Sequence, residues 1–258
     1  MKALTKRKQG GALVATSFEA MAGDGLEDVT AHDLPRASLR IAHQMSPICD
    51  KHDDKWIEGC EPGMIVNMST RQLWSGDEEE GGVLVIPVKY VNHVIEWQPN
   101  RGGFVGEHKP GSPITEGAEW QETVDGKRVW IAENGNQLVD TGTFHVFLIN
   151  ADNTHDEVVI DMSSSQWETA KNWNAFMRSQ RAASEEHPGK TFELPAYSAI
   201  YRLYTRHKSN DDGSWHVWKF EHRGRLDLSD TAHLALFHAA ADYKQVVDVG
   251  VEVDRDQD

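Results

Sequence analysis

The pattern of hydrophobic and polar residues predicts a chain built mainly from β-strands. Runs of β-branched and aromatic residues, bounded by Gly, Asn, Asp and Ser, are typical of strands. They occupy residues 63–69, 83–88, 90–97, 143–150, 157–162, 196–206 and 214–222. Pro87 lies within one of these runs, and proline in a strand favours an edge position or a bulge.

Two pairs of these strands are expected to form hairpins, across residues 150–156 and 209–213. The second hairpin has an unusual strand. Because successive side chains of a strand point to opposite faces, one face carries Tyr197, Ala199, Tyr201, Leu203 and Thr205. A buried core explains that face. It does not explain the other face, which carries Arg202, Tyr204 and Arg206.

A helix is predicted from the possible N-caps Ser163–Ser165 to about Ala183. One of its faces is apolar and should meet the core, through Ala170, Trp173, Phe176 and Met177. The opposite face should be a solvated basic stripe with one large ring, formed by Trp167, Lys171, Arg178 and Arg181. A shorter helix is expected over residues 229–242.

These elements predict an α+β, β-dominated fold: an OB-like barrel with one central helix, long loop insertions and disordered termini. Residues 1–32 are expected to form a flexible basic arm, and residues 33–242 a single OB-like domain. An insertion at about 109–141 should contain one hairpin around Asp125-Gly126. Residues 243–258 form an acidic C-terminal tail, expected to be disordered or extended.

Composition narrows the function classes. The formal net charge of −15 argues against indiscriminate binding to duplex DNA, whose affinity comes mainly from phosphate neutralisation. No apolar run approaches the roughly 20 residues of a membrane helix, and the N-terminus is a poor secretory signal. The two cysteines are too few for a disulfide framework, which favours a reducing compartment, the cytoplasm.

Sequence motifs for catalysis are missing. The chain has no G-x-S-x-G elbow, phosphate-binding P-loop or G-x-G-x-x-G run, so we expect no enzyme and no cofactor. A weak candidate zinc site consists of His43, Cys49, His52 and Cys60, whose spacings match no known finger. The alternative is that the cysteines pack as small hydrophobic residues. The acidic run Glu78-Glu79-Glu80 is expected to be a solvated loop.

Rings interleaved with cations are the most specific chemical signal, because single-stranded nucleic acid is bound by rings that stack on bases and cations that follow phosphates. The candidate stacking residues are Trp97, Phe104, Trp167, Tyr204 and Trp218. The candidate phosphate contacts are Lys171, Arg178, Arg181, Arg202, Arg206 and Lys219, and Arg101 lies in a basic loop beside Phe104. The competing interpretation is that aromatic residues on strands belong to the core.

Several runs of the chain resemble a group of tailed-bacteriophage proteins over roughly residues 34–225. They include Ile86-Pro87-Val88, Glu96-Trp97, Gly102-Gly103-Phe104-Val105-Gly106, Ser164-Ser165-Gln166, Trp173-Asn174, Tyr201-Arg202-Leu203 and Gly213-Ser214-Trp215. In length, acidic tail and ring-plus-cation layout the chain is similar to phage OB-fold single-stranded DNA-binding proteins.

This resemblance implies a single-stranded DNA-binding protein that supports phage DNA replication or recombination. The acidic tail would inhibit DNA binding by competing for the cationic groove, or recruit replisome or recombination proteins. The alternative is a phage virion or host-interaction protein that uses the same aromatic and basic surface as a protein interface.

Overall fold

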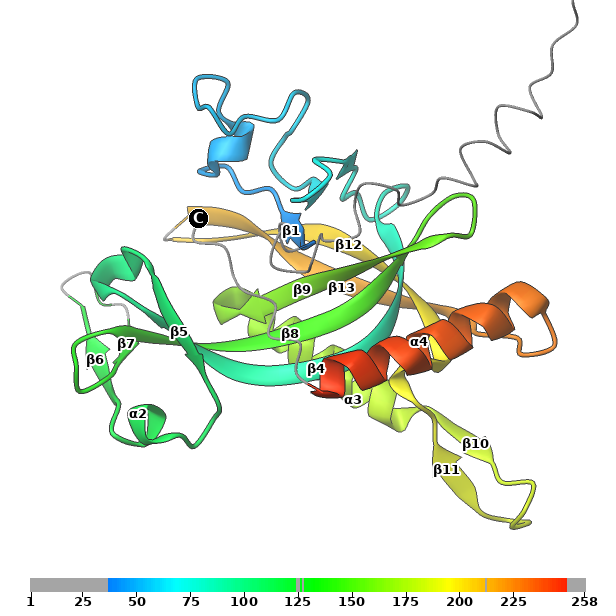
Figure 1. Ribbon diagram of the computed structural model, residues 1–258. Coiled ribbons are helices and arrows are strands. Elements are labelled where there is room, and N and C mark those ends of the chain that lie inside the picture. Colours follow the sequence, from blue (N-terminus) through cyan, green and yellow to red (C-terminus); the bar gives the residue numbers. More distant parts are fainter. Residues whose placement is uncertain (1–36, 124–125, 127, 212, 250–258) are drawn as a thin grey trace, which may run out of the picture. The chain divides into compact units, whose positions relative to one another are not determined.

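A large antiparallel sheet organises the computed structural model, which describes residues 37–123, 126, 128–211 and 213–249 (Figure 1). Its strand order is β13-β12-β4-β8-β7-β6, with β5 paired to β4 and β9 paired to β8. The strands are β4 (Val83–Trp97), β5 (Phe104–His108), β6 (Glu119–Glu122), β7 (Arg128–Ile131), β8 (Gln137–Ile149), β9 (His155–Ser163), β12 (Ala199–Asn210) and β13 (Gly213–Arg225).

The two longest paired strands, β4 and β8, run through both halves of this sheet. Their pairing extends from Leu84 opposite Ile149 to Trp97 opposite Gln137. One end of the pair is flanked by β12 and β9, and the other end by β5 and β7. The register shifts between Pro87 and Lys89, which confirms the predicted irregularity at Pro87 in an interior strand.

The α+β, β-dominated class is confirmed, whereas the OB-like barrel is not. The sheet is open, because its path ends at β13 on one side and at β6 on the other and the two do not pair. Both predicted hairpins are present, as β8–β9 and β12–β13. The insertion at 109–141 also contains the predicted hairpin, formed by β6 and β7.

One face of the sheet is covered by the central helix α3 (Trp167–Ser179). Trp173 is fully buried there, with its ring 4.5 Å from that of Phe144 and 5.6 Å from that of Tyr201. The predicted apolar face of the helix is therefore the face that meets the core. The helix is shorter than predicted, and a 3-10 turn, η4 (Ser164–Gln166), precedes it without any side-chain cap.

After α3 the chain enters a small hairpin instead of continuing as helix. Arg181 begins β10 (Arg181–Ala183), which pairs with β11 (Thr191–Glu193). The predicted end of the helix near residue 183 was wrong because these residues satisfy their backbone groups by strand pairing.

The opposite face of the sheet is covered by helix α4 (Thr231–Val249), shown in orange to red in Figure 1. Its residues Leu236 and Ala240 pack with Ile86 and Phe147 of the sheet. The helix continues past residue 242, so residues 243–249 of the predicted tail are helical. Asp248 forms an ion pair with Lys89, which joins this last part of the helix to β4, and a second one within the helix with Lys244. The predicted basic arm (1–32) and residues 250–258 lie outside the described residues.

The remaining elements are short. A small sheet contains β1 (Leu39–Ile41), β2 (Ile65–Asn67) and β3 (Leu73–Trp74), and the short helices are η2 (Pro47–Cys49), η3 (Pro99–Arg101), α2 (Pro113–Glu116) and η5 (Ala196–Ser198). In the part of the chain that the structure describes, no helix combines the length and apolar character needed to cross a membrane.

We predict that Trp173→Ala lowers the free energy of unfolding by about 3–5 kcal/mol, because it leaves a cavity between α3 and the sheet. Trp120→Ala is the matched control, since the Trp120 side chain lies on the surface with 60% exposure. It should change stability by less than about 1 kcal/mol. Urea unfolding followed by circular dichroism measures both, and equal effects would contradict this view of the core.

Candidate nucleic-acid interface

The predicted ring and cation residues lie in separate places on the fold. The turn between β4 and β5 holds Trp97, Arg101 and Phe104. The start of α3 holds Trp167 and Lys171, and the segment from α3 to β10 holds Arg178 and Arg181. The β12–β13 hairpin holds Arg202, Tyr204, Arg206, Trp218 and Lys219. The start of α3 and the β12–β13 hairpin are joined by hydrogen bonds, such as that from the Thr169 hydroxyl to the Trp218 carbonyl.

Trp218 belongs to the core and not to an interface. Its side chain is only 2% exposed and packs in the cluster that surrounds Trp173. Alternation along β13 places Trp218 on the same face as its partner Thr205, toward α3. A buried ring has no free face for a base, so we remove Trp218 from the candidate stacking residues.

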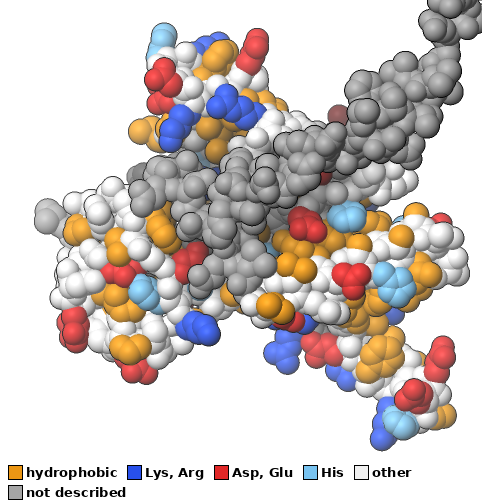
Figure 2. All heavy atoms as spheres, viewed as in Figure 1, with side chains coloured by type: hydrophobic (Ala, Val, Ile, Leu, Met, Phe, Trp, Pro, Cys, Tyr) orange, Lys and Arg blue, Asp and Glu red, His pale blue; other side chains and the backbone are white. Residues whose placement is uncertain are grey.

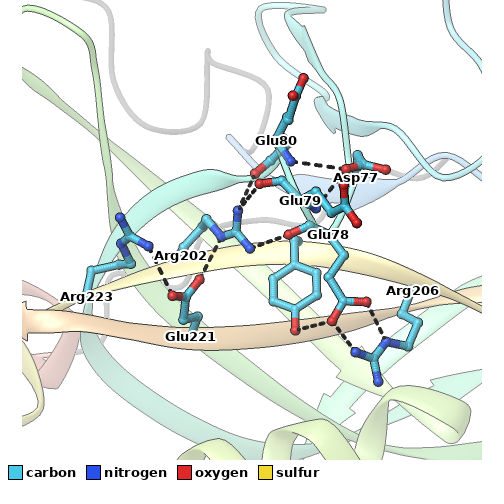
Figure 3. A network of polar contacts seen from close by, with 10 residues as sticks. Asp77, Glu78, Glu79, Glu80, Arg202, Arg206, Glu221 and Arg223 are labelled. Carbon is cyan, nitrogen blue, oxygen red and sulfur yellow. Dashed lines mark hydrogen bonds and ion pairs between the residues drawn. The ribbon is translucent and has the colours of Figure 1, made fainter.

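On the opposite face of β12, Arg202, Tyr204 and Arg206 point toward residues 77–81, which we call the acidic arch (Figure 3). The Arg206 guanidinium forms a two-pronged contact with the Glu78 carboxylate, and the Tyr204 hydroxyl lies 3.3 Å from the same group. The hydrogen bond from Arg206 holds the pKa of Glu78 below its usual value. The acidic run is exposed, as expected for a solvated loop, but Glu78 also forms these contacts within the chain.

Arg202 is bound from several sides. Its guanidinium lies 4.9 Å from the centre of the Tyr204 ring and donates to backbone carbonyls of the acidic arch. Its Nε is 3.0 Å from a carboxylate oxygen of Glu221. Lys219 lies beside this group as the strand partner of Tyr204. The predicted ring-and-cation face thus exists, with carboxylates and carbonyls of the same chain bound to it.

At the start of α3, the Lys171 ammonium lies 5.7 Å from the centre of the Trp167 ring. Trp167 is half-buried and also packs against the core, so only part of its ring is free. Burial raises the pKa of the neighbouring Asp140, and the charge of Lys171 opposes this increase. Trp167 and Lys171 form an ordered ring–cation pair at the surface.

Arg178 and Arg181 do not share a helical stripe, because Arg181 lies in β10. The Arg178 side chain is 81% exposed, with its Nε 3.6 Å from a Glu193 carboxylate oxygen. Arg181 donates to the hydroxyl and the carbonyl of Thr191, at 2.9 and 3.1 Å. Arg178 is thus the more accessible of these two cations.

The turn between β4 and β5 is strained. Asn100 and Arg101 both adopt the left-handed backbone region, with φ of 58° and 56°. This conformation costs a residue with a side chain about 1 kcal/mol or more. The turn is closed by a 2.8 Å hydrogen bond from the Gln98 N–H to the Gly103 carbonyl, and it presents the exposed Arg101. Strain of this kind is found at ligand-binding turns, so we keep this turn as a candidate site.

A ring–cation group that the sequence reasoning missed lies on the β6–β7 hairpin. Trp120 stacks on Trp130 with ring centres 6.0 Å apart and planes 12° apart, and the Arg128 guanidinium lies 5.4 Å from the Trp120 ring centre. The turn signal at Asp125-Gly126 predicted the hairpin but not this pair, because a two-residue turn there would place Trp120 opposite Ile131. The observed register places Trp120 opposite Trp130.

A buried carboxylate fixes the half of the sheet that carries both of these groups. Glu96 of β4 accepts hydrogen bonds from the side-chain amides of Asn134 (2.8 Å) and Asn136 (2.6 Å), and a ring nitrogen of His108 lies 2.7 Å from its other oxygen. Burial by itself raises the pKa of Glu96, but these three contacts outweigh it and hold the pKa below its usual value. Glu96 therefore ties β5 and the β7–β8 turn to β4.

The candidate zinc ligands do not assemble. The sulfur atoms of Cys49 and Cys60 lie 3.4 Å apart, and burial, followed by the contact with Cys49, raises the pKa of Cys60 to about 12. Within the described residues no group of three or more His, Cys, Asp or Glu side chains is arranged to hold a metal ion. The cysteines pack with Ile48 and Ile57, as the alternative proposed.

Surface charge is mixed on the face drawn in Figure 2. There, the Lys and Arg side chains of the described residues lie singly or in small groups, with Asp and Glu side chains nearby. That face offers no broad basic surface in the part of the chain that the structure describes.

We predict that Glu96→Gln lowers the free energy of unfolding by about 1–3 kcal/mol, because the donors around Glu96 lose a charged acceptor. The folded pKa lies below the unfolded value, so the contribution of Glu96 is present above the unfolded value of about 4.3 and is lost as the pH falls through the folded pKa. Wild-type stability should therefore drop more steeply below about pH 4 than that of Glu96→Gln. Urea unfolding at several pH values tests this, with the exposed Glu119→Gln as control, and parallel pH curves for all three proteins would refute it.

Comparison with known proteins places the chain in a phage family. No curated protein and no solved structure matches it. Residues 7–251 match the family described as Pam3 phage gp34-like protein. This match includes the large sheet, both long helices and every candidate residue above. The chain therefore belongs to the Pam3 phage gp34-like family.

Proposed function

We propose that this phage protein binds single-stranded nucleic acid, in support of phage DNA replication or recombination. The observation that carries the proposal is the set of ring–cation pairs on three different elements: Trp120 with Arg128, Trp167 with Lys171, and Tyr204 with Arg202. In such a pair the ring can stack on an unpaired base, and the cation can bind the phosphate of the same nucleotide. Paired bases keep their faces covered by neighbours, so duplex DNA should bind less well.

Trp120 is the most accessible ring of this set. Its side chain is 60% exposed, although its stacking on Trp130 already buries part of it. Exposed tryptophan is costly unless a partner covers it, and base stacking on an aromatic side chain contributes about 1–3 kcal/mol. We propose that this hairpin is the principal base-stacking surface, and that Trp97, Phe104 and Arg101 form a second one at the strained turn.

The negative charge of the protein should make its affinity for nucleic acid moderate and dependent on salt concentration. The chain carries a formal charge of −15, and Arg202 and Arg206 already contact carboxylates of the same chain. A phosphate has to compete with these groups, and added salt screens its attraction to the cations. As part of the same proposal, the protein acts in the host cytoplasm without a cofactor, as a binding protein. Acidic residues near its C-terminus would bind replication or recombination partners.

A second candidate function is binding to another protein, in the virion or at the host. It is favoured by exposed rings on two separate hairpins, Trp120 on β6–β7 and Phe192, which is 47% exposed, on β10–β11. Aromatic residues are enriched at the centres of protein interfaces. Phe192 has no cation over its ring in the described structure, so it serves to separate the two candidates.

We predict that the wild-type protein binds an oligo-dT strand more tightly than a duplex of equal length at low salt. The double variant Trp120→Ala with Arg128→Ala should raise the Kd for oligo-dT about 5- to 100-fold, the loss expected when one base contact is removed. Phe192→Ala is the matched control and should leave the Kd unchanged. Fluorescence anisotropy measures all three proteins.

Two outcomes would reject the nucleic-acid proposal: no binding of either oligonucleotide at micromolar protein, or equal affinity for strand and duplex. If Phe192→Ala weakens oligo-dT binding as much as the double variant does, the β6–β7 hairpin is not the stacking surface. Circular dichroism confirms that each variant is folded.

A further inference from the structure

The acidic arch lies over the cationic face of β12 and is held both at its ends and, through Arg202, along its backbone (Figure 3). Before the arch, the Gly76 carbonyl accepts a 2.8 Å hydrogen bond from the Thr205 N–H, and after it Val83 pairs with Leu203. Within the arch, the Asp77 carboxylate accepts hydrogen bonds from the backbone N–H groups of Glu79 and Glu80.

The group beneath the arch has the geometry of an oxyanion site. Arg206 presents two N–H donors in a fork, with Nε 3.0 Å from one oxygen of Glu78 and a second nitrogen on the other oxygen. Tyr204 adds a hydroxyl donor to the same carboxylate. A guanidinium fork binds carboxylate and phosphate in the same bidentate way. Glu78 therefore occupies a site that a phosphate group also fits.

Arg202 adds positive charge beside this site and binds the arch through its backbone. Its guanidinium donates to the carbonyl oxygens of Glu78, Glu79 and Gly81, which carry no formal charge. Its one carboxylate contact, Glu221, is shared with Arg223. If the Glu78 side chain leaves, the Arg206 fork and the Tyr204 hydroxyl face the vacated position, with Arg202 on the same face of β12.

Exposure makes the Glu78 contact easy to replace. The side chains of Glu78 and Arg206 are 46% and 47% exposed, so water and ions reach both groups. Exposed ion pairs contribute little to stability, even where their geometry is good. The Glu78 side chain can therefore turn away while the backbone of the arch keeps its bonds to Arg202.

We infer that Arg206, Tyr204 and Arg202 form a phosphate-binding site, and that Glu78 occupies it as an internal stand-in until a phosphate of a bound nucleic-acid strand displaces it. This inference rests on the proposed function and adds its regulation: the acidic arch lowers affinity and excludes weak competitors. Arg206 is the principal phosphate ligand, and the Tyr204 hydroxyl orients the bound phosphate. Arg202 holds the arch in place through its contacts with the backbone carbonyls.

The test compares Glu78→Gln with Glu80→Gln in the full-length protein. Both variants remove one negative charge from the arch, but only Glu78 contacts Arg206. Glu78→Gln should tighten oligo-dT binding about three- to tenfold at low salt and steepen the salt dependence by about one released counterion. Glu80→Gln should change the affinity less than twofold. In Glu78→Gln with Arg206→Gln the gain should disappear.

Inorganic phosphate provides a probe that is independent of nucleic acid. It should raise the melting temperature of Glu78→Gln, but not that of the variant that also carries Arg206→Gln. Glu78→Asp, whose side chain is one methylene shorter, should give the same changes as Glu78→Gln but smaller ones. It serves as a second variant if Glu78→Gln does not fold.

The outcomes separate the two proposals. Wild-type binding of oligo-dT with no gain in Glu78→Gln, or an equal gain in Glu80→Gln, overturns the inference and leaves the proposed function standing. Phosphate stabilisation of Glu78→Gln without oligo-dT binding by any variant supports the phosphate site and overturns the nucleic-acid proposal. If neither probe binds, both proposals fall.

Discussion

The long antiparallel pairing of β4 with β8 is the constraint on which the rest of this structure depends. At one end of the pair the sheet is completed by β12 and β9, and α3 and α4 cover its two faces. At the other end it is completed by β5 and β7, where buried Glu96 binds the surrounding amides and His108. Both the Trp120 hairpin and the Arg206 face are held in place through these two strands, so the candidate sites share one rigid support.

The second general feature is that the cationic side chains already contact acidic or carbonyl groups of the same chain. The cations that define the predicted interface do not stand free: Arg206 contacts Glu78, Arg202 contacts Glu221 and carbonyl groups, and Arg178 lies near Glu193. An acidic protein that bears a few exposed arginines gains from this arrangement, because carboxylates already bound to the cations reduce adventitious binding of other anions. Internal pairing of this kind is compatible with a nucleic-acid-binding protein that exchanges its ligand readily.

The distance along the sheet between the two candidate sites also bears on the proposed function. The exposed ring of Trp120, with Arg128 beside it, lies on the β6–β7 hairpin, whereas Arg202 and Arg206 lie on β12. Under that proposal, the main base-stacking surface and the Arg206 phosphate site belong to different parts of the sheet. A strand that used both would have to extend along the molecule, which is how single-stranded nucleic acid, with its flexible backbone, is generally bound.

The sequence by itself determined the β-dominated class, both large hairpins, the presence of the β6–β7 hairpin and the core face of α3, because these follow from local periodicity and turn chemistry. It also assigned Arg202, Tyr204 and Arg206 to one face of a strand. Only the tertiary structure decided what covers each face. Trp218 is in the core because β13 pairs with β12 in a register that turns this ring toward α3, and Glu78 binds Arg206 because β4 and β12 bring together residues more than a hundred positions apart. Such long-range pairings leave no local signal, since they depend on contacts between segments that are distant in the chain.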